Sequence, residues 1–166
     1  EIADEDDFNT FRDSVIKKVS LDYAWGTFKN GRDSDHGIFY KSSKFNFISN
    51  DTISTALRVI NQFTISSKLT HDTLIIYAVH LKASTGDTNA LKREAEVDSL
   101  RKVTDKLHSG ANFLVLGDFN IYSSNEAAYT KLLSTTGSGY FIDYLKDSMS
   151  GTWNKAIYSR YHTQSP

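Results

Sequence analysis

The sequence has no cysteine, and its 166 residues include one proline and one methionine. Without cysteine, the chain cannot form a disulfide scaffold, a thiolate zinc site or an iron–sulfur cluster, and it has no cysteine nucleophile. Long apolar runs are missing as well, because no segment approaches the roughly 18 apolar residues that a membrane-spanning helix needs. We therefore expect neither thiol chemistry nor a membrane-spanning segment.

An excess of charge of one sign is also absent. The 19 Lys and Arg residues are balanced by 20 Asp and Glu residues, which leaves a formal net charge of −1. A protein that wraps nucleic acid non-specifically needs a strongly basic surface, so this balance argues against that class. It does not exclude an enzyme that engages a phosphate group through a metal ion.

The sequence does contain the material for a core. Hydrophobic residues make up 39% of the chain and aromatic residues 13%, which excludes a disordered or low-complexity protein. One compact domain is the usual outcome at this length. Because no internal repeat, linker or compositional break is present, we predict a single domain over residues 1–166.

Hydrophobic periodicity predicts a mixed α/β chain that is rich in strands. Apolar residues recur at helical spacing from Phe8 to Ile16 after an acidic first turn, which predicts an amphipathic helix. The continuously apolar segment 73–79 predicts a central buried strand, and a helical stripe that includes Leu91 follows it over residues 88–107. The other predicted elements are strands at 23–28, 37–41, 45–47, 63–65 and 112–116, the last of them buried, and a helix at 125–133 with a capping box of Ser123 and Glu126.

Polar residues follow the two buried strands at the point where each strand ends. The first strand continues into Val-His-Leu-Lys with His80, and the second continues into Gly-Asp-Phe-Asn with Asp118 and Asn120. Side chains alternate along a strand, so Asp118 and Asn120 point to one side, at the sheet edge where α/β folds bind ligands. A helical crossover between the strands would bring His80 within reach of Asp118. The alternative is a turn capped by Asp and Asn beside a histidine that merely ends a strand.

These motifs resemble the endonuclease/exonuclease/phosphatase superfamily, which includes pancreatic deoxyribonuclease, abasic-site endonucleases, inositol polyphosphate 5-phosphatases and bacterial sphingomyelinases. The resemblance rests on Val-His-Leu-Lys, on a helix containing Arg93, and on Leu-Val-Leu-Gly-Asp-Phe-Asn, and it extends over nearly the whole chain. It implies an α+β fold, the deoxyribonuclease-like four-layer α/β/β/α sandwich.

The resemblance also implies a set of site residues and a Mg²⁺ ion, with Mn²⁺ or Ca²⁺ as alternatives. Glu1 is similar to the family's metal-binding glutamate, and Arg58 is similar to an arginine that contacts phosphate before a strand. Asp118 would orient or deprotonate the attacking water, Asn120 would fix Asp118 or donate to a phosphate oxygen, and His80 would carry a proton or bind phosphate. An acidic helix start and a surface arginine are the plainer alternatives for Glu1 and Arg58.

The implied function is that of a metal-dependent phosphoric ester hydrolase, most simply a monomeric nuclease that acts on nucleic acid. A phosphatase, a sphingomyelinase-type phosphodiesterase and a non-catalytic binding domain of the same fold are the alternatives. Bacterial relatives with this pattern are often exported, so the resemblance favours a secreted protein. We interpret the remaining histidines, His36, His71, His108 and His162, as loop or surface residues, Trp153 and Tyr158 as packing residues, and Asn50-Asp51-Thr52 as a turn.

The family domain is longer than this sequence. It begins with a strand that carries a metal-site asparagine, and it closes with an aspartate and a Ser-Asp-His motif, none of which this sequence contains. We therefore expect an incomplete sandwich that lacks its first strand or strands and its C-terminal strands. Exposed strand edges and the missing half-site would make the 166 residues unstable alone and slow as a phosphodiesterase.

Overall fold

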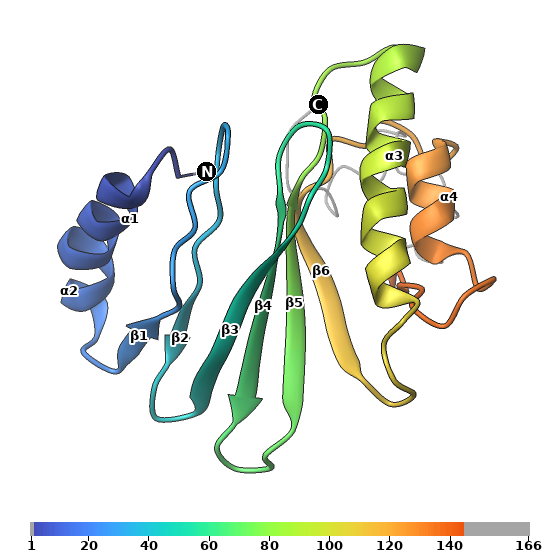
Figure 1. The fold of residues 1–166 in the computed structure, drawn as a ribbon. Coiled ribbons are helices and arrows are strands. Elements are labelled where there is room, and N and C mark those ends of the chain that lie inside the picture. Colours follow the sequence, from blue (N-terminus) through green and yellow to red (C-terminus); the bar gives the residue numbers. More distant parts are fainter. Residues whose placement is uncertain (1, 145–166) are drawn as a thin grey trace. The chain divides into compact units, whose positions relative to one another are not determined.

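The computed structural model describes residues 2–144, and these residues form two compact units (Figure 1). The first unit contains residues 2–80 and His108–Asp118, and the second contains Leu81–Leu107 and residues 119–144. The chain therefore passes from one unit to the other directly after His80 and directly after Asp118. Glu1, Trp153, Tyr158 and His162 lie outside the described residues.

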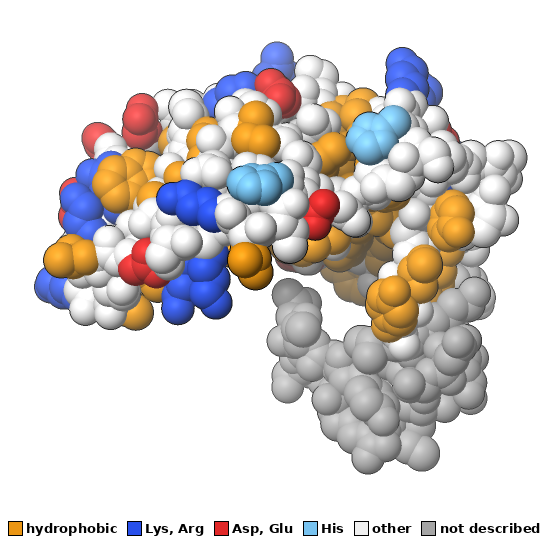
Figure 2. Space-filling model, turned by 90° about the horizontal axis from the view of Figure 1, so that it is seen from below, with side chains coloured by type: hydrophobic (Ala, Val, Ile, Leu, Met, Phe, Trp, Pro, Cys, Tyr) orange, Lys and Arg blue, Asp and Glu red, His pale blue; other side chains and the backbone are white. Residues whose placement is uncertain are grey.

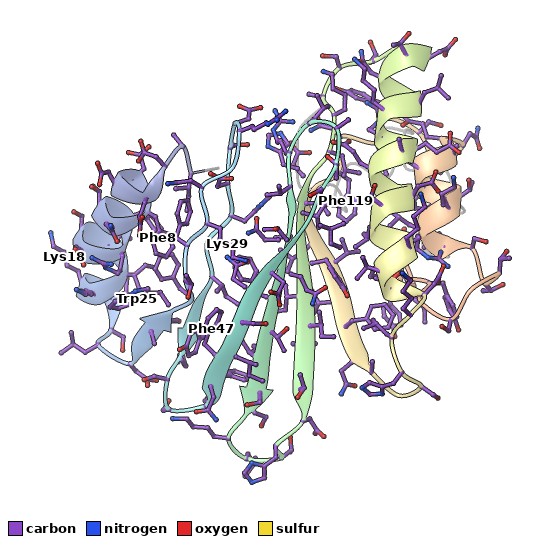
Figure 3. The ribbon with its side chains drawn as sticks, viewed as in Figure 1. Phe8, Lys18, Trp25, Lys29, Phe47 and Phe119 are labelled. Carbon is purple, nitrogen blue, oxygen red and sulfur yellow. The ribbon has the colours of Figure 1, made fainter. Side chains whose placement is uncertain are left out.

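The first unit begins with a helical segment whose middle is π-helical. Asp4 caps it through a side-chain bond to the amide of Asp7, and the segment contains α1 (Glu5–Phe11), η1 (Arg12–Ile16) and α2 (Lys17–Val19). Phe8 projects from α1 toward the strands, where its ring stacks at 4.9 Å on each of two phenylalanines, Phe28 and Phe39 (Figure 3). The helix is confirmed, but the expected continuous apolar stripe is wrong, because Phe11 and Val15 are exposed.

The strands of the first unit form two sheets. A two-stranded antiparallel sheet pairs β1 with β2, and a four-stranded sheet has the order β3-β4-β5-β6. In the larger sheet β5 lies between β4 and β6, as expected of a central strand, and only the β5–β6 pairing is parallel. The six strands are β1 (Tyr23–Trp25), β2 (Phe39–Lys41), β3 (Phe45–Ile53), β4 (Ile60–Ser67), β5 (Thr73–His80) and β6 (Asn112–Asp118).

Two expectations about these strands are wrong. Asn50-Asp51-Thr52 is not a turn, because β3 continues through it and pairs Asn50 with Phe63 of β4. β6 is not buried on both faces, because Leu114 and Leu116 are exposed. The alternation of exposed and half-buried residues along β6 is that of a strand with one uncovered face.

The second unit contains the helices α3 (Asp87–Thr104) and α4 (Ala127–Leu133), which pack against each other. The buried face of α3 is more polar than its apolar periodicity indicates: Leu91 is 64% exposed, whereas Arg93 is 1% exposed and Glu96 is buried. The predicted position of Leu91 in the core is therefore wrong. A buried charge is stable only when it is paired, and Arg93 is paired.

Arg93 makes the contacts that join the parts of the second unit. Its Nε donates to Glu126 at 2.8 Å, and its Nη1 donates to the carbonyl oxygens of Lys82 and Ser84 at 2.8 and 2.9 Å. Glu126 also accepts a bond from the amide of Tyr122, so it does not form the predicted capping box with Ser123. Glu126 instead neutralises the buried Arg93.

The two sheets and the helices together make the chain a mixed α+β protein, which confirms the predicted class. In the described residues, no helix is long and apolar enough to cross a membrane. On the face shown in Figure 2, basic and acidic side chains are interspersed rather than separated, as the balanced composition indicates.

Candidate active site

His80 and Asp118 are the last residues of the two parallel strands, and they lie directly opposite each other in the register of β5 and β6. Nε2 of His80 is 3.9 Å from Oδ2 of Asp118. This distance is too long for a hydrogen bond but short enough for a strong charge interaction when the ring is protonated. The predicted proximity of these two residues is confirmed.

The two side chains differ in their access to solvent. His80 is buried, whereas the side chain of Asp118 is 38% exposed. A carboxylate in this position can reach water or a ligand, while the imidazole beside it has a fixed position. Ser34 contributes to that fixed position, because its Oγ lies 2.8 Å from Nδ1 of His80.

Gly117, the first residue of the Gly-Asp-Phe-Asn motif, allows the two strands to approach. Its φ of +130° is in the region that favours glycine. A Cβ at this position would overlap the carbonyl oxygen of Val79 and come within 3.0 Å of the Val79 carbonyl carbon and amide nitrogen. The glycine is therefore needed for the backbone geometry that places Asp118 opposite His80.

Sequence reasoning missed a chain of buried polar groups next to this pair. Nδ1 of His36 lies 3.1 Å from Oδ1 of Asn61, which is fully buried. Asn61 donates to Asn50 at 3.1 Å, and Asn50 donates to the carbonyl oxygen of Thr27 at 2.8 Å. His36 is a loop residue, as interpreted, because it lies in the connection between β1 and β2. It is half-buried there, and its bond to the buried Asn61 was not predicted.

Burial lowers the pKa of His36, and its hydrogen bond to Asn61 opposes this shift only in part. His36 therefore tends to be neutral, and it belongs to the same polar neighbourhood as His80. A signal for this network exists in the sequence: Asn50 and Asn61 occupy positions in β3 and β4 where an apolar side chain would otherwise be expected.

Arg58 precedes β4, as the resemblance implied, but its guanidinium is already bound. Its Nη2 lies 2.5 Å from a carboxylate oxygen of Asp33, a residue whose side chain is 59% exposed. The Arg58 side chain itself is largely buried, and its Nε has no hydrogen-bond partner. A largely buried guanidinium with one exposed carboxylate partner is suited to exchanging that partner for another anion.

Asn120 belongs to the second unit. Its backbone has a positive φ of +48°, and its Nδ2 donates to the carbonyl oxygen of Leu81 at 3.1 Å. Asparagine is one of the few residues that adopt this conformation readily, which accounts for its position directly after Phe119 at the end of the motif.

The end of β6 contributes one carboxylate, that of Asp118. Within residues 2–144, no group of three or more His, Asp or Glu side chains could hold a metal ion. Magnesium commonly binds to one or two carboxylates together with substrate oxygens and water. A single carboxylate is within what magnesium uses, whereas zinc needs several protein ligands. Glu1, the expected ligand, lies outside the described residues.

Comparison with known proteins identifies the fold. No protein-family model and no curated protein matches the sequence. Among solved structures, the catalytic domain of human Nocturnin with a bound sulfate anion is 24% identical, with a TM-score of 0.59 over 78% of this chain and 52% of that chain. An endonuclease/exonuclease/phosphatase family protein from Bacteroides thetaiotaomicron is 15% identical, with a TM-score of 0.55 over 75% of this chain and 49% of that chain.

A third similar structure is D. rerio TDP2 complexed with a single-strand DNA product. It is 14% identical, with a TM-score of 0.52 over 72% of this chain and 46% of that chain. The chain thus spans about half the length of these structures. It shares with them the endonuclease/exonuclease/phosphatase fold, which is the fold that its motifs resemble.

Proposed function

We propose that this protein hydrolyses phosphodiesters with the help of a divalent metal ion, Mg²⁺ in preference to Mn²⁺ or Ca²⁺. The observation that carries the proposal is the His80–Asp118 pair at the ends of β5 and β6, in a chain with a fold that phosphoester hydrolases share. An exposed carboxylate and a fixed imidazole about 4 Å apart suit general acid–base work on a water molecule and a phosphate oxygen.

Each residue has a separate role in this proposal. The Asp118 carboxylate orients the attacking water and accepts its proton, while Nε2–H of His80 donates to a phosphate oxygen. For Asn120, the resemblance implies donation of an amide hydrogen to a phosphate oxygen. Glu1 would hold the Mg²⁺ ion, which, when bound, neutralises phosphate charge and stabilises the departing oxygen.

Nucleic acid is the substrate class that we favour. The similar structures include one solved with a single-strand DNA product and one solved with sulfate, an anion of phosphate-like shape and charge. The chain has a formal net charge of −1 rather than an excess of basic residues, so binding would depend on specific phosphate contacts such as the one proposed for Arg58.

The experiment is hydrolysis by purified variants with and without Mg²⁺. Three substrates separate the alternatives: a DNA oligonucleotide, bis-p-nitrophenyl phosphate and sphingomyelin in vesicles. Asp118→Ala and His80→Ala should each lower kcat/KM by about 10²- to 10⁴-fold, and EDTA should abolish the activity of the unchanged protein. Cleavage of sphingomyelin but not of DNA would contradict the nucleic-acid substrate class.

Two exposed residues at the β4–β5 hairpin supply matched controls. Asp72→Asn removes a carboxylate there, and His71→Asn removes an imidazole at a positive φ of +63° that asparagine tolerates. Both variants should keep the activity of the unchanged protein. Loss of activity in the controls to the same extent, or no hydrolysis of any substrate by any variant, would favour a non-catalytic domain.

The Arg58 contact is tested through the residue that occupies it. Asp33→Asn removes the carboxylate that competes with substrate for the guanidinium, so KM should fall by about threefold to tenfold with little change in kcat. Arg58→Lys removes the planar fork and should raise KM instead. If both variants leave KM unchanged, Arg58 does not bind the substrate phosphate.

A further inference from the structure

Ser34 lies 46 residues before His80 in the sequence, and its hydroxyl is nevertheless 2.8 Å from the ring nitrogen Nδ1. Ser34 is in the connection between β1 and β2, whereas His80 ends β5. The contact therefore joins a loop of the first unit to the side of the imidazole that faces away from Asp118.

The loop does not need this hydroxyl for its conformation. Asp35 stabilises the loop by a hydrogen bond within it, because Oδ2 of Asp35 accepts a 2.7 Å bond from the amide of Gly31. The backbone of Asp35 also pairs with Ile2 through bonds of 2.8 and 3.3 Å. The Asp33–Arg58 ion pair supplies another anchor. The Ser34 hydroxyl can thus be removed while the contacts on both sides of it remain.

The direction of the Ser34–His80 bond follows from what each group can donate. A hydroxyl can donate or accept, but a carboxylate can only accept. Because Nε2 of His80 faces the Asp118 carboxylate at 3.9 Å, the proton of the neutral ring is stabilised on Nε2. Nδ1 then has a lone pair, and the hydroxyl of Ser34 donates to it.

We propose that Ser34 is a positioning residue that holds His80 as the Nε2–H tautomer, with Nε2–H directed to the end of β6 where Asp118 lies. The role of this proton in catalysis rests on the proposed phosphodiesterase function. Without the hydroxyl, the Nδ1–H tautomer becomes competitive, and it has no hydrogen to offer a phosphate oxygen from Nε2. Ser34 therefore acts on the reaction only through His80.

The first test is independent of activity. Long-range ¹H–¹⁵N NMR of the unchanged protein should give His80 Nε2 the shift of a protonated nitrogen and Nδ1 that of an unprotonated one. Ser34→Ala should move both shifts toward a mixture of tautomers, and Ser34→Thr, which keeps the hydroxyl, should restore them. A protonated Nδ1 in the unchanged protein, or an unaltered His80 spectrum in Ser34→Ala, would overturn the proposal.

The second test uses kinetics on bis-p-nitrophenyl phosphate. Ser34→Ala should lower kcat by about tenfold with little change in KM, and Ser34→Thr should recover most of the loss. The control is Ser49→Ala, which removes an exposed hydroxyl bonded to Asp51 and should change neither constant. If NMR shows the tautomer shift but kcat is unaltered, the catalytic part of the proposal is wrong.

A protein that hydrolyses nothing would refute the proposed function without affecting the tautomer assignment, so the two failures can be distinguished. A thermal melt of each variant separates unfolding from misplacement of the ring. Ser34→Ala should melt close to the unchanged protein, because the anchors at Asp33 and Asp35 remain. If it is substantially unfolded, Ser34 is a structural residue and the positioning role is rejected.

Discussion

Gly117 lies opposite Val79 in the parallel pairing of β5 and β6, and a Cβ on Gly117 would overlap the Val79 carbonyl oxygen. The residue combines two constraints, a positive φ and a backbone neighbour that has no room to move. Together they explain in physical terms why a glycine directly precedes the aspartate of the proposed site.

We predict that Gly117→Ala destabilises the first unit by at least about 3 kcal/mol, through strain and overlap with fixed backbone. Gly110→Ala is the matched control, because Gly110 also has a positive φ, +82°, but has open space around it. Its cost should be about 1–2 kcal/mol, the penalty of the backbone conformation alone. Denaturant unfolding followed by tryptophan fluorescence measures both, and equal losses would contradict the proposed overlap.

The sequence was informative wherever one strong local pattern acted alone. The continuous apolar segment predicted β5. The polar residues that end this segment and the later apolar segment predicted the pair His80 and Asp118, which are the last residues of β5 and β6. Parallel strands end at the same edge of a sheet, so the proximity of the two residues followed from topology without knowledge of any contact.

The sequence was misleading where burial depends on a distant partner. Arg93 looks like a surface residue of an amphipathic helix until Glu126, 33 positions later, neutralises it. His36 is a loop residue whose bond to Asn61, 25 positions later, is likewise not visible in the local sequence; Asn61 in turn donates to Asn50. Local periodicity contains no information about such pairings, which arise from tertiary contacts.

Arg93→Ala should be among the most destabilising changes in the second unit. It leaves the largely covered Glu126 carboxylate without its cation, and it removes the donors that bind the carbonyl oxygens of Lys82 and Ser84. We expect a loss of about 3–5 kcal/mol. Hydrogen exchange of the α3 and α4 amides measures it, with Lys92→Ala on the exposed side of the same helix as a control that should change stability by less than about 0.5 kcal/mol.

His36 should make the first unit less stable in acid. Burial lowers its pKa in the folded state, so the unfolded state binds a proton more readily as the pH falls below about 6.5. Stability from this residue is therefore present above pH 6.5 and is lost as the pH falls toward the lowered pKa. The melting temperature measured from pH 7.5 to 5.5 should fall more steeply for the unchanged protein than for His36→Gln, and parallel curves would show that His36 does not contribute.

The uncovered face of β6 should promote self-association. In the part of the chain that the structure describes, β6 pairs with β5 alone, and Leu114 and Leu116 are 36% and 49% exposed on it. An edge strand presents unpaired backbone N–H and C=O groups that can pair with another chain, and exposed apolar side chains beside them favour that association. Leu116→Lys places a charge at that edge and should reduce light scattering at concentrations where the unchanged protein aggregates.

Leu21→Lys is the control, because Leu21 is 88% exposed but lies in a turn after α2 rather than in a strand. If Leu21→Lys reduces scattering as much as Leu116→Lys does, general surface hydrophobicity is responsible and the strand edge is not.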